Sequence, residues 1–234
     1  DPITRLEGHG RIEIFLNDRG EVANAYFQVP ELRGFEKFCE GRPVEELPRI
    51  VPRICGVCPE AHHLASSKAV DAVYHVQPPS AAVKLRELFY SAHFVHSHTA
   101  HFFALAAPDF VVGPTAPPEQ RNILGVIAKV GLEAGREVIK HRAYAQQIQE
   151  VIGGKATHPV CGLPGGMSKA LTEEERKEIE AKARSIVEFG KFAIQVFNDV
   201  VLANKSYVDL ILSDVYSMQS YYMGLVDSRG RVNF

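Results

Sequence analysis

The sequence predicts a mainly α protein, a bundle of long helices with small peripheral β elements. Helical periodicity extends over three long stretches, from Ser80 to about Ala107, from about Glu119 to Val151 and from Glu173 to Asn204. Each stretch is longer than the mean helix of about 11–12 residues, and this length favours a bundle over an α/β sheet. The chain also shows no repeating strand–helix–strand pattern and no internal repeat.

The β elements are expected at the two ends of the chain. Residues 11–16 alternate in polarity, residues 17–20 supply a turn, and residues 22–29 form the returning strand. Residues 221–226 and 231–234 are expected to form a second strand-like pair around a turn.

Between these ends the helices follow in order. Residues 34–54 should form short helical pieces, because three prolines interrupt them: Pro43, Pro48 and Pro52. A helix should run from Pro59 to about His75, since proline is favoured in the first helical turn. A proline-rich elbow that begins at Pro108 should end the next helix.

The two remaining long helices carry further local signals. In the helix over 119–151, Gly131 and Gly135 lie on one side and permit close approach of another helix. A glycine-rich loop over 153–166 follows. Thr172 and Glu175 form a capping box at the start of the last long helix.

Length and composition limit the class of protein. The 234 residues, 46% of them hydrophobic, are predicted to form a single domain over 1–234, with a β-hairpin region at 1–30 and the helical bundle at 59–212. The 26 basic and 28 acidic residues give no charge excess that would attract nucleic acid or an anionic membrane. No apolar run approaches the roughly 18–20 residues needed for a membrane span, and no signal peptide opens the chain. We therefore expect a cytoplasmic protein. The chain begins with Asp1, which indicates a processed chain or a fragment.

The most informative motif is a pair of cysteines separated by two residues, Cys55 and Cys58, with His62 four residues later. Two thiolates at this spacing can bind a soft transition metal from one turn. The turn precedes a predicted helix N-terminus, whose positive dipole should lower the thiol pKa. His62 lies one helical turn beyond Cys58, within reach of a hydrogen bond to its sulfur.

Three other interpretations of the cysteine pair remain open: half of a structural zinc site, a thioredoxin-like redox dithiol, or no functional role. Zinc needs further ligands, but Cys39 and Cys161 are isolated in the sequence. A redox dithiol usually follows a strand of a βαβ unit, which is absent here. Four cysteines in this length are too few for a disulfide scaffold, so we expect reduced thiols.

A second group of possible ligands is the set of histidines at positions 93, 96, 98 and 101. Three of them, His93, His96 and His101, could share a broad helical face. No carboxylate lies at a suitable spacing on that face, so packing and hydrogen bonding are the favoured roles.

Several motifs, spread in order along the chain, resemble those of the large subunit of nickel–iron hydrogenases, in the cytoplasmic branch that reduces methyl viologen or deazaflavin. They are Thr4-Arg5-Leu6-Glu7-Gly8-His9, Arg33-Gly34-Phe35-Glu36, Arg53 to Cys58 with His62, Ser97-His98 with His101-Phe102-Phe103, Ala107-Pro108-Asp109-Phe110, and His158-Pro159 with Gly165-Gly166. The resemblance extends over the whole chain, but over only about the N-terminal half of the family's length.

The resemblance implies a nickel–iron centre whose iron also carries cyanide and carbon monoxide. Cys55 would be a terminal thiolate on nickel and Cys58 a thiolate that bridges nickel and iron, with His62 beside the sulfur. Glu7 would bind magnesium or a similar hard cation, consistent with the preference of such cations for oxygen ligands.

The resemblance also implies roles for three further residues. Glu36 would begin the proton path, Asp109 would lie above the open coordination position, and His158 would face the nearest iron–sulfur cluster of a small subunit. Without the resemblance, each of these residues would be interpreted as an ordinary turn or loop residue.

The implied reaction is reversible heterolytic cleavage of H2 into protons and electrons. Electrons would pass to an iron–sulfur small subunit, then to a further electron-acceptor subunit, since this chain has too few cysteines for such clusters.

The chain departs from the family in one respect, because no second cysteine pair follows Cys161. We therefore expect this chain alone to be inactive. Two alternatives remain: a truncated, non-catalytic scaffold, and a relative of the quinone-reductase subunit of complex I. The latter has the same fold without the nickel-binding cysteines, so Cys55 and Cys58 argue against it.

Overall fold

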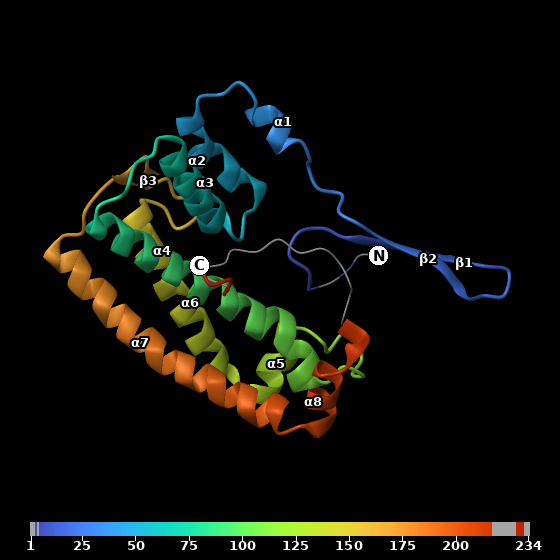
Figure 1. The fold of residues 1–234 in the computed structure, drawn as a ribbon. Helices are drawn as coiled ribbons and strands as arrows, with labels where there is room; N and C mark the ends of the chain where they lie inside the picture. The colour runs from blue at the N-terminus through green and yellow to red at the C-terminus, as the bar shows by residue number, and fades with distance from the viewer. Residues whose placement is uncertain (1–2, 4, 217–227, 232–234) are drawn as a thin grey trace. The chain divides into compact units, whose positions relative to one another are not determined.

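The computed structural model describes residues 3, 5–216 and 228–231. It divides into two compact units, Asp1–Ala193 and Ile194–Phe234. The described residues are mainly helical, with two small antiparallel sheets, which confirms the predicted fold class (Figure 1). The single domain over 1–234 stays a prediction. Within the described ranges, every helix is too short or too polar to cross a bilayer.

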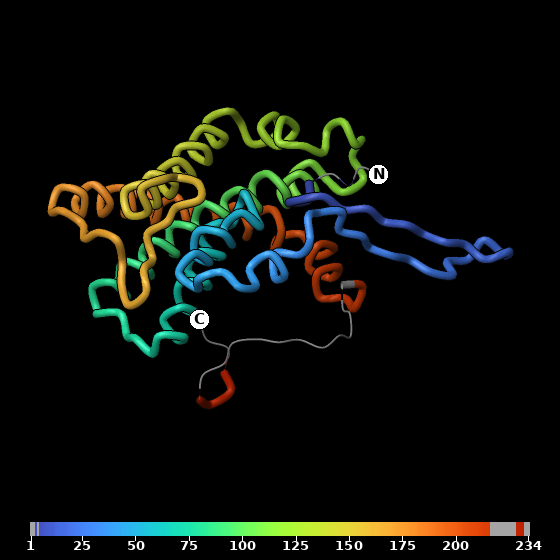
Figure 2. The backbone as a smooth tube through the Cα atoms, turned by 90° about the horizontal axis from the view of Figure 1, so that it is seen from above, coloured from blue at the N-terminus to red at the C-terminus, as the bar shows by residue number. Residues whose placement is uncertain are grey.

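The predicted N-terminal hairpin is confirmed. Strands β1 (Arg11–Leu16) and β2 (Val22–Gln28) pair antiparallel, with Ile12 opposite Phe27 (Figure 2). The side-chain oxygen of Asn17 accepts hydrogen bonds from the backbone N–H groups of Arg19 and Glu21 and so closes the turn. Apolar side chains of this hairpin are more than half exposed, Ile12, Ile14 and Phe27 among them.

Short helices follow, as the prolines predict. They are α1 (Phe35–Cys39), a 3-10 turn (Val44–Glu46), α2 (Leu47–Ile50) and a second 3-10 turn (Val51–Ile54). Helix α3 (Pro59–Val73) begins with proline, as predicted. The buried rings of Pro48 and Pro52 pack these turns into the protein next to the start of α3.

The bundle of the first unit is built from α3, α4 (Ser80–Ala100), α6 (Leu132–Gly153) and α7 (Glu173–Phe197), long helices that Figure 1 labels. Their apolar faces meet in one buried cluster, made of Leu64, Phe89, Ala92, Ile148, Ile152, Cys161 and Ile179. Phe89, at the middle of α4, is fully buried. The loop between α6 and α7 contributes Cys161 and a tiny hairpin, β3 (Gly162–Leu163) with β4 (Gly166–Met167).

The predicted stop at Pro108 is wrong. After α4 the chain continues as π-helical turns over His101–Ala106 and Pro108–Val112, and it turns away only at Gly113, where φ is 116°. Pro108 opens the second of these π-helical segments, directly after the helical residue Ala107. Only glycine adopts the backbone conformation of Gly113 without strain.

The single helix predicted over 119–151 is two helices, α5 (Ile123–Val130) and α6. Gly131 separates them with φ at 93° and ψ at 156°, a conformation that is essentially restricted to glycine. Gly135 does permit a close approach, since a Cβ there would lie 3.3 Å from Ile127 of α5. The side chain of Asn122 caps α5 by accepting hydrogen bonds from two backbone N–H groups.

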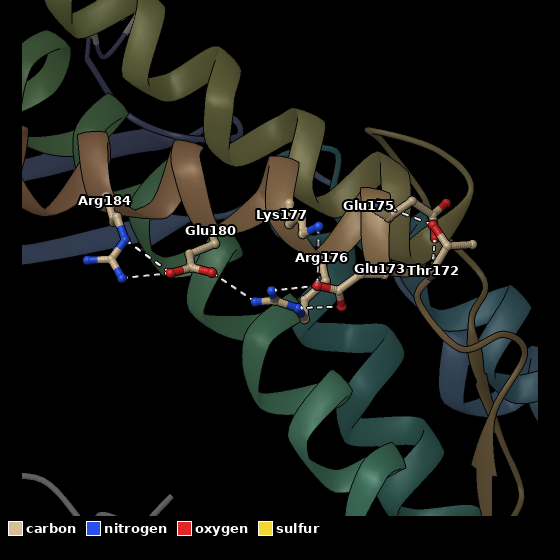
Figure 3. Close-up of polar contacts among 7 residues, drawn as sticks. All are labelled: Thr172, Glu173, Glu175, Arg176, Lys177, Glu180 and Arg184. Carbon is tan, nitrogen blue, oxygen red and sulfur yellow. Dashed lines mark hydrogen bonds and ion pairs between the residues drawn. The ribbon is translucent and has the colours of Figure 1, made fainter.

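The capping box before α7 is confirmed (Figure 3). The Glu175 carboxylate accepts a hydrogen bond from the Thr172 N–H at 2.9 Å, and the Thr172 hydroxyl accepts one from the Glu175 N–H at 3.2 Å. Helix α7 ends at Phe197, earlier than predicted, and π-helical turns over Asn198–Leu202 lead to α8 (Lys205–Ile211). The strand-like residues predicted at 221–226, and all but the first of those predicted at 231–234, lie outside the described residues.

Candidate metal centre

The Cys55–Cys58 turn lies between the second 3-10 turn and the first residue of α3. The Cys55 N–H donates to the carbonyl oxygen of Pro52, and the Cys58 N–H donates to the sulfur of Cys55 at 3.3 Å. This N–H···S contact folds the two cysteines toward each other, and Cys58 immediately precedes Pro59 of α3.

The structure brings together the three residues that the spacing singled out. One donor atom from each of Cys55, Cys58 and His62 lies within 4.8 Å of the others, and all three side chains are half-buried. His62 reaches this position because its N–H donates to the Cys58 carbonyl one helical turn earlier. In the described part of the chain, no other group of three such residues meets this criterion. Thiolate sulfur with imidazole nitrogen fits a soft or borderline metal such as nickel or iron.

A carboxylate reaches the same turn from the N-terminal segment. The Cys55 thiol contacts Oε1 of Glu7 with a sulfur–oxygen distance of 3.6 Å. Arg5, two residues earlier, donates to both carboxylate oxygens of Asp109 at 2.8 Å and to the carbonyl oxygen of Leu105 at 2.8 Å. The Arg5 backbone has a φ of 56°, a strained conformation for a residue with a side chain. These bonds attach the Glu7 segment to the π-helical turns after α4.

Two other predicted site residues lie elsewhere. Glu36 is exposed in the first turn of α1, and no described contact links its carboxylate to Cys55 or Cys58. His158 is half-buried in the loop after α6, with a φ of 53° and no hydrogen-bond partner for its Nδ1 among the described residues. Asp109 accepts from Arg5 and lies 3.6 Å from Arg121, so it is held between two guanidinium groups.

The electrostatics of the Cys58 thiol differ from the expectation. Burial, the hydrogen bond with Cys55 and the nearby charges of Cys55, Glu7 and Glu60 raise the pKa of Cys58 to about 12. The helix N-terminus should lower this pKa, but the acidic surroundings and the loss of water outweigh it. A metal that binds here must therefore displace a proton from Cys58.

The histidines of α4 are packing residues, as the sequence favours. His93 and His96 are buried, and Nδ1 of His93 lies 3.0 Å from a carboxylate oxygen of Glu60 on α3. Glu60 is 2% exposed, although at its place in the first turn of a helix the sequence suggests an ordinary surface acid. Glu60 and Arg5 are site neighbours that sequence reasoning missed, because only the fold shows where their partners lie.

The remaining cysteines do not join the site. Cys39 is half-buried and Cys161 is fully buried, and all four cysteines are free thiols. Burial raises the pKa of Cys161 to about 12. A four-cysteine zinc site therefore does not form among the described residues.

A thiol turn at the start of a bundle helix, with an imidazole and a carboxylate beside it, offers the donor set of a metal-binding protein. Comparisons with known proteins specify the family. The family model described as nickel-dependent hydrogenase matches residues 33–117, and one described as HoxL-like matches residues 1–32. The chain belongs to the nickel-dependent hydrogenase large-subunit family.

Similar curated proteins are hydrogenase subunits. The chain is 53% identical to an iron-sulfur subunit of the F420-non-reducing hydrogenase of Archaeoglobus profundus, over 100% of this chain and 48% of that protein. It is 47% identical to a vhu subunit of the F420-non-reducing hydrogenase of Methanocaldococcus jannaschii, over 100% of this chain and 54% of that protein. The chain thus spans about half the length of the curated relatives it matches.

Solved structures agree with this assignment. An NAD+-reducing [NiFe]-hydrogenase in the H2-reduced state matches with a TM-score of 0.87 and 37% identity, over 100% of this chain and 51% of that chain. The Ni-Fe-Se hydrogenase from D. vulgaris Hildenborough matches with a TM-score of 0.68 and 32% identity, over 81% of this chain and 40% of that chain.

Proposed function

We propose that this chain supplies one thiolate pair, Cys55 and Cys58, to the nickel–iron centre of a hydrogenase that cleaves H2 reversibly into protons and electrons. The observation that carries the proposal is the convergence of Cys55, Cys58 and His62 within 4.8 Å, with a carboxylate in contact with Cys55. Such a centre supplies Lewis acidity that makes bound H2 acidic. Cys55 would hold this centre as a terminal thiolate and Cys58 as a shared one, and the iron would carry cyanide and carbon monoxide.

The protein's own residues then receive the proton. Glu7 is favoured over Glu36 as the first acceptor, because its carboxylate oxygen lies 3.6 Å from the Cys55 sulfur whereas Glu36 is exposed on α1. A proton on this sulfur can pass to Glu7 without a rearrangement of the backbone. Magnesium or a similar hard cation was assigned to Glu7 from the sequence. That role of Glu7 stays a proposal, since no group of three possible ligands among the described residues includes Glu7 or Glu36.

Electrons leave toward a partner in this proposal. His158 would face an iron–sulfur cluster of a small subunit, and a further subunit would accept the electrons. His158 is half-buried, and its Nδ1 has no hydrogen-bond partner among the described residues, which supports a contact beyond this chain. We propose that the protein acts in the cytoplasm, as the sequence predicts.

Metal analysis of the complete hydrogenase that contains this chain tests the proposal. Cys58→Ala should abolish nickel retention and hydrogen turnover, because it removes a thiolate that no neighbouring residue replaces. Cys39→Ala is the matched control, since Cys39 is also half-buried and free but lies outside the site.

The outcomes separate the proposed function from the scaffold alternative. Stoichiometric nickel in the unmodified protein and in Cys39→Ala, with loss of nickel in Cys58→Ala, supports the metal centre. A complete protein without nickel, or one in which Cys58→Ala keeps its nickel, would contradict it and favour a scaffold.

A further inference from the structure

The loop between α6 and α7 is held by three buried side chains that none of the steps above uses. They are His63 and Asp71 of α3 and Arg86 of α4, and we name them the loop clamp. His63 is fully buried, and Asp71 and Arg86 are 7% and 8% exposed. Charged side chains this deeply buried are costly unless they are paired and hydrogen-bonded, and the loop supplies most of their partners.

The first member of the loop clamp binds the start of the small β3–β4 hairpin. Nε2 of His63 accepts hydrogen bonds from the N–H groups of Cys161 at 3.0 Å and Gly162 at 2.8 Å. Its other ring nitrogen therefore carries the proton and donates to the Pro48 carbonyl oxygen at 2.7 Å. His63 thus connects the loop to α2, seven residues before the thiol turn.

The other two members bind the tip of the hairpin. Asp71 accepts a hydrogen bond from the Gly165 N–H at 2.7 Å, and the Arg86 guanidinium donates to the carbonyl oxygens of Leu163 at 3.0 Å and Gly166 at 2.9 Å. Arg86 and Asp71 also pair with each other. The polarity is complementary, because the carboxylate meets an N–H group and the guanidinium meets carbonyl groups.

The close fit leaves no room at this contact. A Cβ added to Gly162 would lie 2.4 Å from the Ser67 hydroxyl oxygen of α3. Three side chains together bind five main-chain groups of a segment that has only two short strands of its own. This is recognition of the backbone of one loop, which packing of apolar side chains alone would not require.

The clamped segment carries His158 only three residues before Cys161. Pro159 is fully buried, while the His158 backbone has a φ of 53°. A strained backbone persists only where the surrounding structure holds it, and the bonds of the loop clamp begin three residues after His158, at Cys161.

We propose that His63, Asp71 and Arg86 are positioning residues that hold the 158–167 loop, and with it His158, at a defined place relative to the thiol turn. The helix α3 links the two, since it begins directly after Cys58 and carries His63 and Asp71. The consequence for electron transfer rests on the proposed function, in which His158 is the residue at the electron exit.

The test uses the complete hydrogenase with the variants Asp71→Asn and Arg86→Lys. Three quantities are measured: hydrogen–water isotope exchange, turnover with an electron acceptor, and deuterium uptake of the 158–168 peptide. We expect acceptor turnover to fall about tenfold while isotope exchange stays unchanged, because a misplaced contact slows only the step that uses it. Deuterium uptake of the loop should rise in both variants.

A double variant, Asp71→Arg with Arg86→Asp, separates backbone recognition from simple charge pairing. It restores an ion pair but places the guanidinium against the Gly165 N–H, so we expect no rescue. Arg184→Ala is the control, since this exposed arginine pairs only with Glu180 on α7 (Figure 3) and should leave all three quantities unchanged.

Three results would overturn the loop clamp as a positioning device: rescue by the double variant, unchanged deuterium uptake, or a parallel loss of isotope exchange and acceptor turnover. If Asp71→Asn does not assemble, Arg86→Lys decides alone, because lysine keeps the pair with Asp71 but cannot span both carbonyl groups. Failure of the proposed function is distinct: the unmodified protein would then show no isotope exchange, while deuterium uptake would still report on the loop.

Discussion

At the scale of single residues, the centre is assembled by contacts of two very different ranges. Cys55, Cys58 and His62 meet because they lie within one turn and the start of one helix, so their spacing in the sequence predicts the cluster. Glu7 meets Cys55 across 48 positions, and Arg5 meets Asp109 across 104. No periodicity encodes such pairs, so the role of a carboxylate such as Glu7 could be taken only from the resemblance.

The contact between Glu7 and Cys55 leads to a prediction about proton transfer. In the complete hydrogenase, Glu7→Gln should lower hydrogen turnover by about 10²–10⁴-fold, because the amide keeps the shape of the side chain but cannot accept the proton. Nickel content, measured on the same samples, should stay unchanged.

Glu36→Gln is the comparison that decides between the two carboxylates. We expect a turnover close to that of the unmodified enzyme, since Glu36 lies exposed on α1. The reverse pattern, with the loss in Glu36→Gln and not in Glu7→Gln, would restore the assignment made from the sequence.

At the scale of elements, apolar periodicity predicts where helices exist but not where they break. The pattern over 119–151 continues through Gly131, so the sequence indicates one helix where the structure has α5 and α6. The π-helical turns past Pro108 were missed for a related reason, because their wider hydrogen bonding has no distinct residue signature. The hairpin and the capping box were predicted correctly, since each depends on neighbours in the chain.

The helix break leads to a prediction with a matched control. Gly131→Ala should destabilise the protein by about 1–3 kcal/mol, because a side chain is strained at a φ of 93° and ψ of 156°. Gly190→Ala, in the interior of α7 with no atom within 4 Å of the added Cβ, should instead stabilise it by about 0.5–1 kcal/mol. Denaturant unfolding of both variants measures the difference in the free energy of unfolding. A change of the same sign in both variants would show that the break between α5 and α6 does not require glycine at position 131.

At the scale of the first compact unit, the interior of the bundle is unusually polar. Besides apolar residues it buries Glu60 on α3, His93 and His96 on α4, and Gln149 on α6. Neither ring nitrogen of His96 has a hydrogen-bond partner among the described residues. Sequence patterns place such residues on helices without indicating burial, because a histidine on a helix is as often exposed as buried. The stability of the bundle should therefore depend on pH through these groups.

The shifted pKa of His96 determines whether stability rises or falls with pH. Burial, the charge of Arg142 and, to a smaller extent, His93 lower the pKa of His96 to about 4, against the opposing effect of Glu60. An unfolded chain binds a proton at this residue below about pH 6.5, whereas the folded protein does so only near pH 4. Between these values the unfolded state holds more protons, so stability falls as the pH falls, by up to about 3 kcal/mol in total. The apparent unfolding temperature, measured from pH 7 to pH 4, should thus decline less steeply in His96→Gln, which keeps a polar side chain without a titrating ring. Parallel curves for the two proteins would mean that His96 takes up its proton in the folded state as readily as in the unfolded state. A partner from outside the bundle would then offset the cost of burying the charged ring.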